Sequence, residues 1–330
     1  MDLFKSILCV VSADETAGLT VERAASVAAN NQARLTLASV VPRIAEATRM
    51  PDGEHPSPGE LQASMAGRQL QALESLAASH RSGLDIRVEV LVGDGFLEII
   101  RAVLRNGHDL VIKPAENPGW TARLFGSDDM HLLRKCPCPV WLTKPGEKVN
   151  YGCILVAVDI GIESENALEG GLNRRLLELA SSLALSDFAA LHVVHAWEAI
   201  GEAVLRAWSD KPELASLRYV EAERSRHEAA MEQLRIHLRA KVGEEAYAYL
   251  APGFHLQRGA ATRVIPELAQ RLQADLVVMG TLGRVGISGL FIGNTAEAIL
   301  EQIRCSVLAI KPPGFVSPVT LADRPAATEG

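Results

Sequence analysis

The chain reads Asp275-Leu276-Val277-Val278-Met279-Gly280-Thr281-Leu282-Gly283, and nine residues later it reads Gly293-Asn294-Thr295. The apolar run predicts a buried strand, and a helix is predicted from Thr295 onward. Glycine lets backbone amides approach an anion without a Cβ in the way, and the first amides of a helix point toward the same place. The pattern therefore predicts a phosphate cradle and nucleotide binding. Tight turns also need glycine, so spacing alone leaves a purely structural role open.

Two common nucleotide-binding loops are excluded. The sequence contains no Gly-Lys dipeptide, which removes the Walker A loop and its phosphate-binding lysine. The spacing of Gly280, Gly283 and Gly286 also differs from the Gly-x-Gly-x-x-Gly fingerprint of dinucleotide-binding proteins.

The chain contains the same pattern twice, which indicates a duplicated domain. Three segments of the first half recur in the same order in the second half. The pairs are 7–12 with 154–159, 108–112 with 274–278, and 138–145 with 305–312. We expect one domain over residues 1–147, a second over 150–313 and a C-terminal tail over 314–330.

Short apolar strands alternate with helical patterns in each half, which is typical of βαβ units and a parallel sheet. The predicted fold is α/β, with two tandem doubly wound domains that each contain a five-stranded parallel sheet. In such sheets ligands bind outside the carboxyl ends of strands where the strand order reverses, so Asp159 and the glycine loop should face one crevice. A long helix starting near Pro212 is expected to bury one stripe, formed by Leu217, Val220, Met231, Leu234 and Leu238.

Composition narrows the class of protein. The 330 residues are 48% hydrophobic and 22% charged, with a net charge of −7, which disfavours a nucleic-acid binder. Neither a membrane-spanning run nor a signal peptide is recognisable, so we expect no membrane association. Five cysteines, most of them in or beside predicted strands, favour a reducing compartment and a cytoplasmic location. The Cys136-Pro137-Cys138 segment near His131 has the wrong spacing for a zinc pair and is expected to be structural.

The glycine loop resembles the Gly-x2-Gly-x9-Gly-Ser/Thr loop of the universal stress protein family, and the duplicated pattern resembles its tandem-domain members. The resemblance implies flavodoxin-like, adenine nucleotide alpha hydrolase-like domains that bind ATP or another adenine nucleotide, with Mg²⁺ as an optional companion. It further implies that Asp159 touches the nucleoside and that Val193 lies against adenine. The phosphates would be held by a loop that contains Gly280, Gly283, Arg284, Gly293, Asn294 and Thr295. Asn294 departs from the family pattern, although asparagine can still cap a helix and donate a hydrogen bond.

The first half has lost these features. Ser12 stands where the second half has Asp159, and Pro114 stands where it has Gly280. Only Gly126-Ser127 survives of the loop, and Asp128 and Asp129 follow it. Two carboxylates would repel a polyphosphate and proline has no amide to donate, so we expect nucleotide binding in the second half only.

We therefore expect a stress-response protein that binds an adenine nucleotide and is not an enzyme. Two alternatives stay open, namely slow ATP hydrolysis with Arg284 stabilising phosphate charge, and a scaffold without nucleotide that binds a lipid-like or protein ligand. The resemblance also implies an intrachain pseudo-dimer, because family members commonly pair domains through their last strands. Val140-Trp141-Leu142 and Val307-Leu308-Ala309 are the candidate strands, and tandem chains could also form a homodimer.

Overall fold

The computed structural model describes residues 3–12, 17–45, 56–116, 125–161, 171–281 and 293–321. These residues form two compact units, which we call the first and the second domain. The first domain comprises the described residues up to Val149 together with 315–321, and the second comprises those from Asn150 to Gly314. None of the helices in the described part of the chain is long and apolar enough to span a bilayer.

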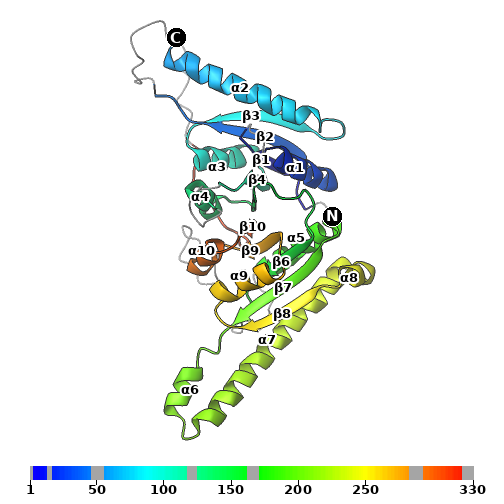
Figure 1. The fold of residues 1–330 in the computed structure, drawn as a ribbon, viewed down its shortest axis with the longest axis vertical. Helices are drawn as coiled ribbons and strands as arrows, with labels where there is room; N and C mark the ends of the chain where they lie inside the picture. The colour runs from blue at the N-terminus through cyan, green and yellow to red at the C-terminus, as the bar shows by residue number, and fades with distance from the viewer. Residues whose placement is uncertain are drawn as a thin grey trace. The chain divides into compact units, whose positions relative to one another are not determined.

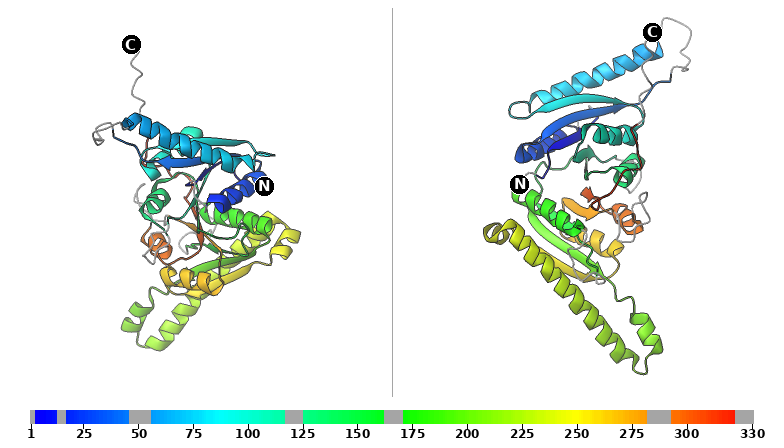
Figure 2. Two further views of the ribbon diagram at one scale, coloured as in Figure 1. Left: turned by 45° about the horizontal axis from the view of Figure 1, so that its top comes forward. Right: turned by 180° about the vertical axis from the view of Figure 1, so that it is seen from behind.

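The first domain is built from alternating strands and helices (Figure 1). Its strands lie in the order β3-β2-β1-β4-β5, and each pairing between these neighbours is parallel. Helix α2 runs along β2 and β3 (Figure 2). The elements are β1 (Ser6–Val10), α1 (Ala17–Asn31), β2 (Arg34–Val41), α2 (Pro58–Ala78), β3 (Ile86–Val92), α3 (Gly95–Asn106), β4 (Leu110–Pro114), α4 (Ser127–Lys135) and β5 (Val140–Thr143).

The second domain repeats this plan and adds helices before its third strand. Its strands lie in the order β8-β7-β6-β9-β10, again with parallel pairing between these neighbours. The elements are β6 (Cys153–Ala157), α5 (Leu172–Asp187), β7 (Ala190–Trp197), α6 (Glu202–Trp208), α7 (Pro212–Val242), α8 (Glu244–Leu250), β8 (Gly253–Arg258), α9 (Ala261–Arg271), β9 (Leu276–Gly280), α10 (Asn294–Leu300) and β10 (Ser306–Ile310).

The predicted fold class is confirmed, and the strand order defines the crevice more closely. Counted along each domain, the order is 3-2-1-4-5. The reversal therefore falls between the first and fourth strands, whereas the 2-1-3-4-5 order of flavodoxin places it between the first and third. The end of β6 and the end of β9 consequently lie side by side, and so do the ends of β1 and β4.

An aspartate before the fourth strand anchors the first strand in both domains. The Asp109 carboxylate accepts hydrogen bonds from the backbone amides of Lys5 (2.7 Å) and Ser6 (3.0 Å). The Asp275 carboxylate accepts the equivalent bonds from Gly152 (2.7 Å) and Cys153 (3.0 Å). The repeated aspartate is thus explained by the need to satisfy the amides where the central strand begins.

The predicted buried stripe of the long helix is only partly correct. Met231, Leu234 and Leu238 of α7 are buried, but Leu217 is 67% exposed. A helix of 31 residues is about 46 Å long, whereas a strand of 6 residues such as β8 spans about 20 Å. The sheet can cover only part of α7, and Figure 1 shows its first turns extending with α6 beyond the strands of this domain.

The beginning of the predicted tail is attached to the first domain. The Ser317 hydroxyl donates a hydrogen bond to the backbone carbonyl of Lys135 (2.7 Å), at the end of α4. The same oxygen accepts a bond from the amide of Val319 (3.1 Å). Ser317 therefore connects the beginning of this segment to the end of α4.

Candidate functional site

A cavity of about 320 Å³ opens at the carboxyl ends of β6 and β9 in the second domain. It lies at the strand-order reversal, where ligands bind in doubly wound sheets. Four of the predicted site residues line it: Asp159, Gly280, Gly293 and Thr295. Residues separated by more than a hundred positions in the chain are thereby brought to one place.

Asp159 follows β6 and is exposed at the cavity. Its backbone is held by Asn173 of α5, whose side-chain oxygen accepts a bond from the Asp159 amide (3.2 Å). The Asn173 side-chain nitrogen donates to the Asp159 carbonyl (2.8 Å). Because both backbone groups of Asp159 are bonded to one buried side chain, the direction in which this residue leaves the strand is defined.

Asn173 was not predicted from the sequence. It occupies the first turn of α5, is 9% exposed and lines the cavity. A polar residue facing inward in a first helical turn is the signal that could have identified it, because such residues often bond to the chain that precedes the helix.

The two described glycines of the loop, Gly280 and Gly293, have different surroundings. An ideal Cβ on Gly280 would lie 2.9 Å from Cδ2 of Leu172, so a side chain there would press against the start of α5. Gly293 precedes α10 with a φ of −60°, a value open to any residue. Its amide donates to the carbonyl of Thr281 (3.0 Å), which closes the base of the loop. A side chain at Gly280 would therefore displace the end of the Leu172 side chain.

The other predicted site residues are placed differently. Val193 lies in the middle of β7 with 0% of its surface exposed, and it does not line the cavity. Instead, Ala196 lines the cavity, about 10 Å further along the same strand. Asn294 begins α10 without lining the cavity. Gly283 and Arg284 lie outside the described residues.

The remaining wall of the cavity is apolar. It is formed by side chains from α5, α9, β9 and α10, among them Leu176, Ile265, Met279 and Ile299. An apolar wall facing a few polar groups at one end is the usual composition of a small-molecule site.

A pair of buried histidines connects this region to α7. The His195 Nε2 and His227 Nδ1 atoms are 2.9 Å apart, and both residues are buried. The other ring nitrogen of His195 is 3.3 Å from the carbonyl oxygen of Val158, directly before Asp159. His227 also packs against Trp197, which lies on β7 like His195. These contacts fix α7 to β7 and to the segment directly before Asp159.

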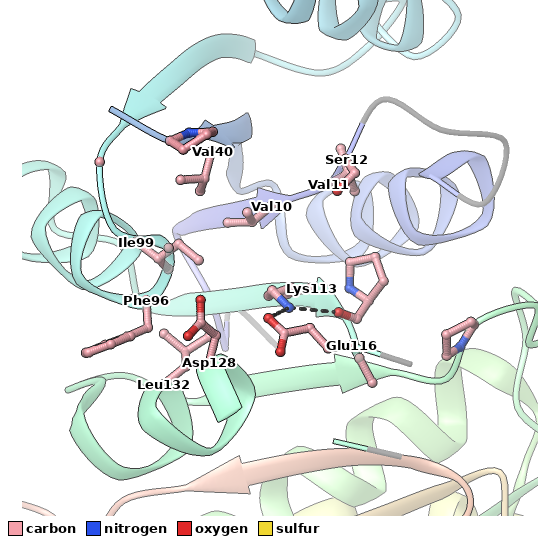
Figure 3. Close-up of a pocket in the computed structure, with 16 residues that line it drawn as sticks. Val10, Val11, Ser12, Val40, Phe96, Ile99, Lys113, Glu116, Asp128 and Leu132 are labelled. Atoms are coloured by element: carbon pink, nitrogen blue, oxygen red, sulfur yellow. Dashed lines mark hydrogen bonds and ion pairs between the residues drawn. The ribbon is translucent and has the colours of Figure 1, made fainter. Parts of the chain in front are cut away.

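The first domain has a larger cavity, of about 590 Å³, at the equivalent strand ends (Figure 3). Ser12, Pro114 and Asp128 line it where the second domain has Asp159, Gly280 and Thr295. Behind it the buried carboxylate of Asp129 accepts hydrogen bonds from the amides of Glu116 (2.7 Å) and Gly126 (3.2 Å).

The cysteines take no part in either cavity. The Cys136 and Cys138 sulfurs are 3.6 Å apart as free thiols, and His131 stacks on Phe96 with ring centroids 4.6 Å apart. Burial raises the pKa of the Cys9 thiol to about 12 and that of Cys153 to about 11. Within the described ranges, no group of three or more histidine, cysteine or acidic residues could hold a metal ion.

Comparison with known proteins gives a consistent result for both halves. The model of the universal stress protein family matches residues 3–144 and 150–311. Universal stress protein E of Escherichia coli K12 is 36% identical over 246 residues, which cover 73% of each chain. A homologue of that protein from Haemophilus influenzae is 34% identical over 212 residues, or 64% of each chain.

Solved structures resemble nearly the whole chain. A protein of unknown function from Pseudomonas aeruginosa PAO1 is 27% identical, covers 94% of both chains and has a TM-score of 0.64. A universal stress protein from Archaeoglobus fulgidus shares the fold at 18% identity, with a TM-score of 0.59 over 93% of this chain and 98% of its own.

Proposed function

Since the chain belongs to the universal stress protein family, which supports a role in the stress response, we propose that it performs this role by binding ATP or another adenine nucleotide in its second domain. Occupancy of the site would change the partners or the assembly of the protein. The first domain would not take part in nucleotide binding.

The observation that carries this proposal is the composition of the second-domain cavity. It combines a carboxylate at the end of the first strand with the two ends of the glycine loop. The Asp159 carboxylate suits ribose hydroxyls, because a hydrogen bond to a charged group is stronger than one between neutral groups. Gly280, Gly293 and Thr295 suit phosphate oxygens, and the apolar wall suits the base.

A buried hydroxyl supports the phosphate end of the site. Thr281 follows Gly280 and is 1% exposed, and its Oγ1 atom has no hydrogen-bond partner within the part of the chain that the structure describes. Buried polar atoms are normally paired, and Thr281 lies next to Gly280 without itself lining the cavity, so a phosphate oxygen held by the loop is its proposed partner. Gly283 and Arg284 would complete this end, and Mg²⁺ would add charge neutralisation when bound with the phosphates.

We propose binding rather than hydrolysis. Hydrolysis needs a base that activates water within hydrogen-bond reach of the terminal phosphate. Asp159 is the one carboxylate among the described residues that line the cavity, and it is assigned to the ribose. Its position after the first strand, rather than in the glycine loop, fits that assignment.

The test is a titration of the full chain with ATP, AMP and inorganic triphosphate, followed by isothermal calorimetry. Asp159→Asn removes the charge and keeps the size. It should weaken ATP and AMP roughly tenfold to a hundredfold, because a charged hydrogen bond contributes about 1.5–3 kcal/mol, and it should spare triphosphate. Ser12→Ala at the equivalent position of the first domain is the matched control. Unchanged AMP affinity in Asp159→Asn would refute the nucleoside half of the site.

A further inference from the structure

The first-domain cavity is a second binding site candidate with its own chemistry. Its volume of about 590 Å³ lies within the range of about 300–1,000 Å³ that small-molecule pockets span. It opens between the ends of β1, β2 and β4 and the first turns of α3 and α4 (Figure 3). The nucleotide assignment made above leaves this space without a ligand.

The anion position of this domain is filled by the protein itself. Asp129 of α4 has 0% exposed surface, and its carboxylate receives the amides of Glu116 and Gly126. The Lys113 ammonium donates to the same carboxylate at 2.7 Å. Backbone amides and a lysine that could have held a phosphate are therefore already bonded to a fixed carboxylate. An incoming phosphate would have to displace a buried charge, which is unfavourable.

Two further carboxylates face the open space. Figure 3 shows the Asp128 side chain projecting from α4 toward Ile99 and the Glu116 side chain beside Lys113. Asp128 lies close to the start of α3, since an ideal Cβ on Gly95 would be 2.5 Å from its Oδ2 atom. Lys113 also reaches Glu116, at a longer 3.5 Å. Lys113 is the one cation among the described residues that line the cavity, and it stands against Glu116, Asp128 and the buried Asp129 behind them.

The pKa of the Glu116 carboxyl reflects both its burial and its two acidic neighbours. Burial is the largest cause that raises the pKa of the Glu116 carboxyl; Lys113 lowers this pKa, and the nearby Asp129 and Asp128 raise it further by smaller amounts. A positive group placed in the cavity would relieve this repulsion.

The other side of the cavity is apolar. Val10 and Val11 at the end of β1, Ile99 of α3 and Leu132 of α4 line it, and each is nearly or fully buried. These side chains offer a surface for a hydrocarbon or aromatic group opposite the carboxylates.

We propose that the first-domain cavity binds an organic cation, in which an ammonium or amidinium group meets Glu116 and Asp128 and an apolar body lies against Val10, Ile99 and Leu132. Nucleotides and other polyanions are excluded by the same carboxylates. The protein would then have one site for an anionic ligand in the second domain and one site for a cationic ligand in the first domain.

Three probes of nearly the same shape test this proposal. Benzamidine is a cation, benzamide is neutral and benzoate is an anion. Binding of each to the full chain is measured by saturation-transfer NMR and calorimetry at neutral pH. Benzamidine should bind at least tenfold more tightly than the other two. Equal binding of the three probes, or no binding of benzamidine, would overturn the proposal.

Variants locate the site. Glu116→Gln combined with Asp128→Asn should abolish the preference for benzamidine, whereas Glu267→Gln removes one charge from the exposed face of α9 and should preserve it. Asp128→Asn alone serves if thermal unfolding shows that the double variant is not folded, and it should reduce the preference at least threefold. Saturating ATP should leave benzamidine binding unchanged. Competition by ATP, or a preference that survives these substitutions, would refute the assignment.

Discussion

The two domains have the same strand order and a cavity in the same place, but they differ in what lies behind the fourth strand. In the first domain Lys113 and Asp129 form an ion pair at 2.7 Å. Aligned by β4 with β9 and by the start of α4 with that of α10, the second domain has Met279 and Ala296 at these positions. One domain satisfies its loop amides with its own carboxylate, while the other leaves that place uncharged and open to a ligand.

This difference shows two ways in which the same fold can fill the region behind its fourth strand. A buried ion pair replaced by apolar residues is often neutral or favourable for stability, whereas removal of one partner leaves an uncompensated buried charge. We therefore expect stability when both positions are charged, as in Lys113 and Asp129, or when both are apolar, as in Met279 and Ala296. Intermediate combinations should be worse than either end state.

The largest expected effect follows from breaking this set. Asp129→Ala leaves the amides of Glu116 and Gly126 without their acceptor, and it leaves the Lys113 ammonium with the more distant Glu116 carboxylate (3.5 Å) and the Pro114 carbonyl (3.2 Å). The free energy of opening around β4 and α4 should fall by about 3–5 kcal/mol. Hydrogen exchange with mass spectrometry measures this locally, and peptides of β9 and α10 in the same chain report the unaffected domain.

The companion variant is Lys113→Met combined with Asp129→Ala, which reproduces the residues of the second domain. It should recover at least half of the lost free energy, because the two charges of the buried Lys113–Asp129 pair are removed together. A double variant as unstable as Asp129→Ala alone would show that the amide contacts, rather than the charge balance, stabilise this region.

A smaller effect is expected at the second-domain cavity. Asn173→Ala removes both bonds to the backbone of Asp159, and the segment after β6 should lose about 1–3 kcal/mol of local stability in hydrogen exchange. AMP affinity should fall with it, since Asp159 is no longer directed. Asn106→Ala is the control, because that side chain makes only a long bond of 3.5 Å to Glu89 among the described contacts. If hydrogen exchange after β6 were the same in Asn173→Ala and in the control variant, Asn173 would have no role in positioning Asp159.

The smallest effect concerns acid stability. His192 of β7 and His255 of β8 lie with ring nitrogens 3.0 Å apart. Burial lowers the pKa of both rings, and the charge of His192 adds to the lowering at His255. The unfolded chain therefore takes up protons more readily once the pH falls below about 6.5, and the stability of the second domain should decrease from pH 7 to pH 5.

Calorimetric melting of His255→Gln tests this pH effect. The variant keeps a hydrogen-bonding side chain beside His192 but removes one of the two coupled rings. Its melting temperature should fall less between pH 7 and pH 5 than that of the unmodified chain. An equal or steeper decrease would show that the acid sensitivity arises elsewhere.

The fold was largely predictable because its signals are local and repeated. The apolar run before Gly280 predicted β9, which the structure places at Leu276–Gly280. The cavity beside Asp159 followed from the topology of such sheets. Leu217 was wrongly expected to be buried, because helical periodicity identifies a face but does not tell how far the neighbouring sheet extends.

The features of the two cavities that the sequence did not predict depend on contacts between residues far apart in the chain. Lys113 and Asp129 are 16 positions apart, and their pairing requires the end of a strand and the start of a helix to meet. Asn173 acts on a residue 14 positions earlier. The two aspartates after Gly126-Ser127 led to the prediction that phosphate is disfavoured here, but the sequence does not tell that the Asp129 carboxylate accepts the amides of Glu116 and Gly126.

The aspartate that anchors the first strand has a consequence for synthesis on the ribosome. Asp109 bonds to Lys5 across 104 positions of the chain. Closing a loop of that length costs about 4 kcal/mol of chain entropy, and β1 cannot gain its central neighbour until β4 has been translated. At about 5–20 residues per second, the wholly buried run Ile7-Leu8-Cys9 waits about 5–20 s for this partner. Until then the edge of β1 that will pair with β4 has no strand beside it.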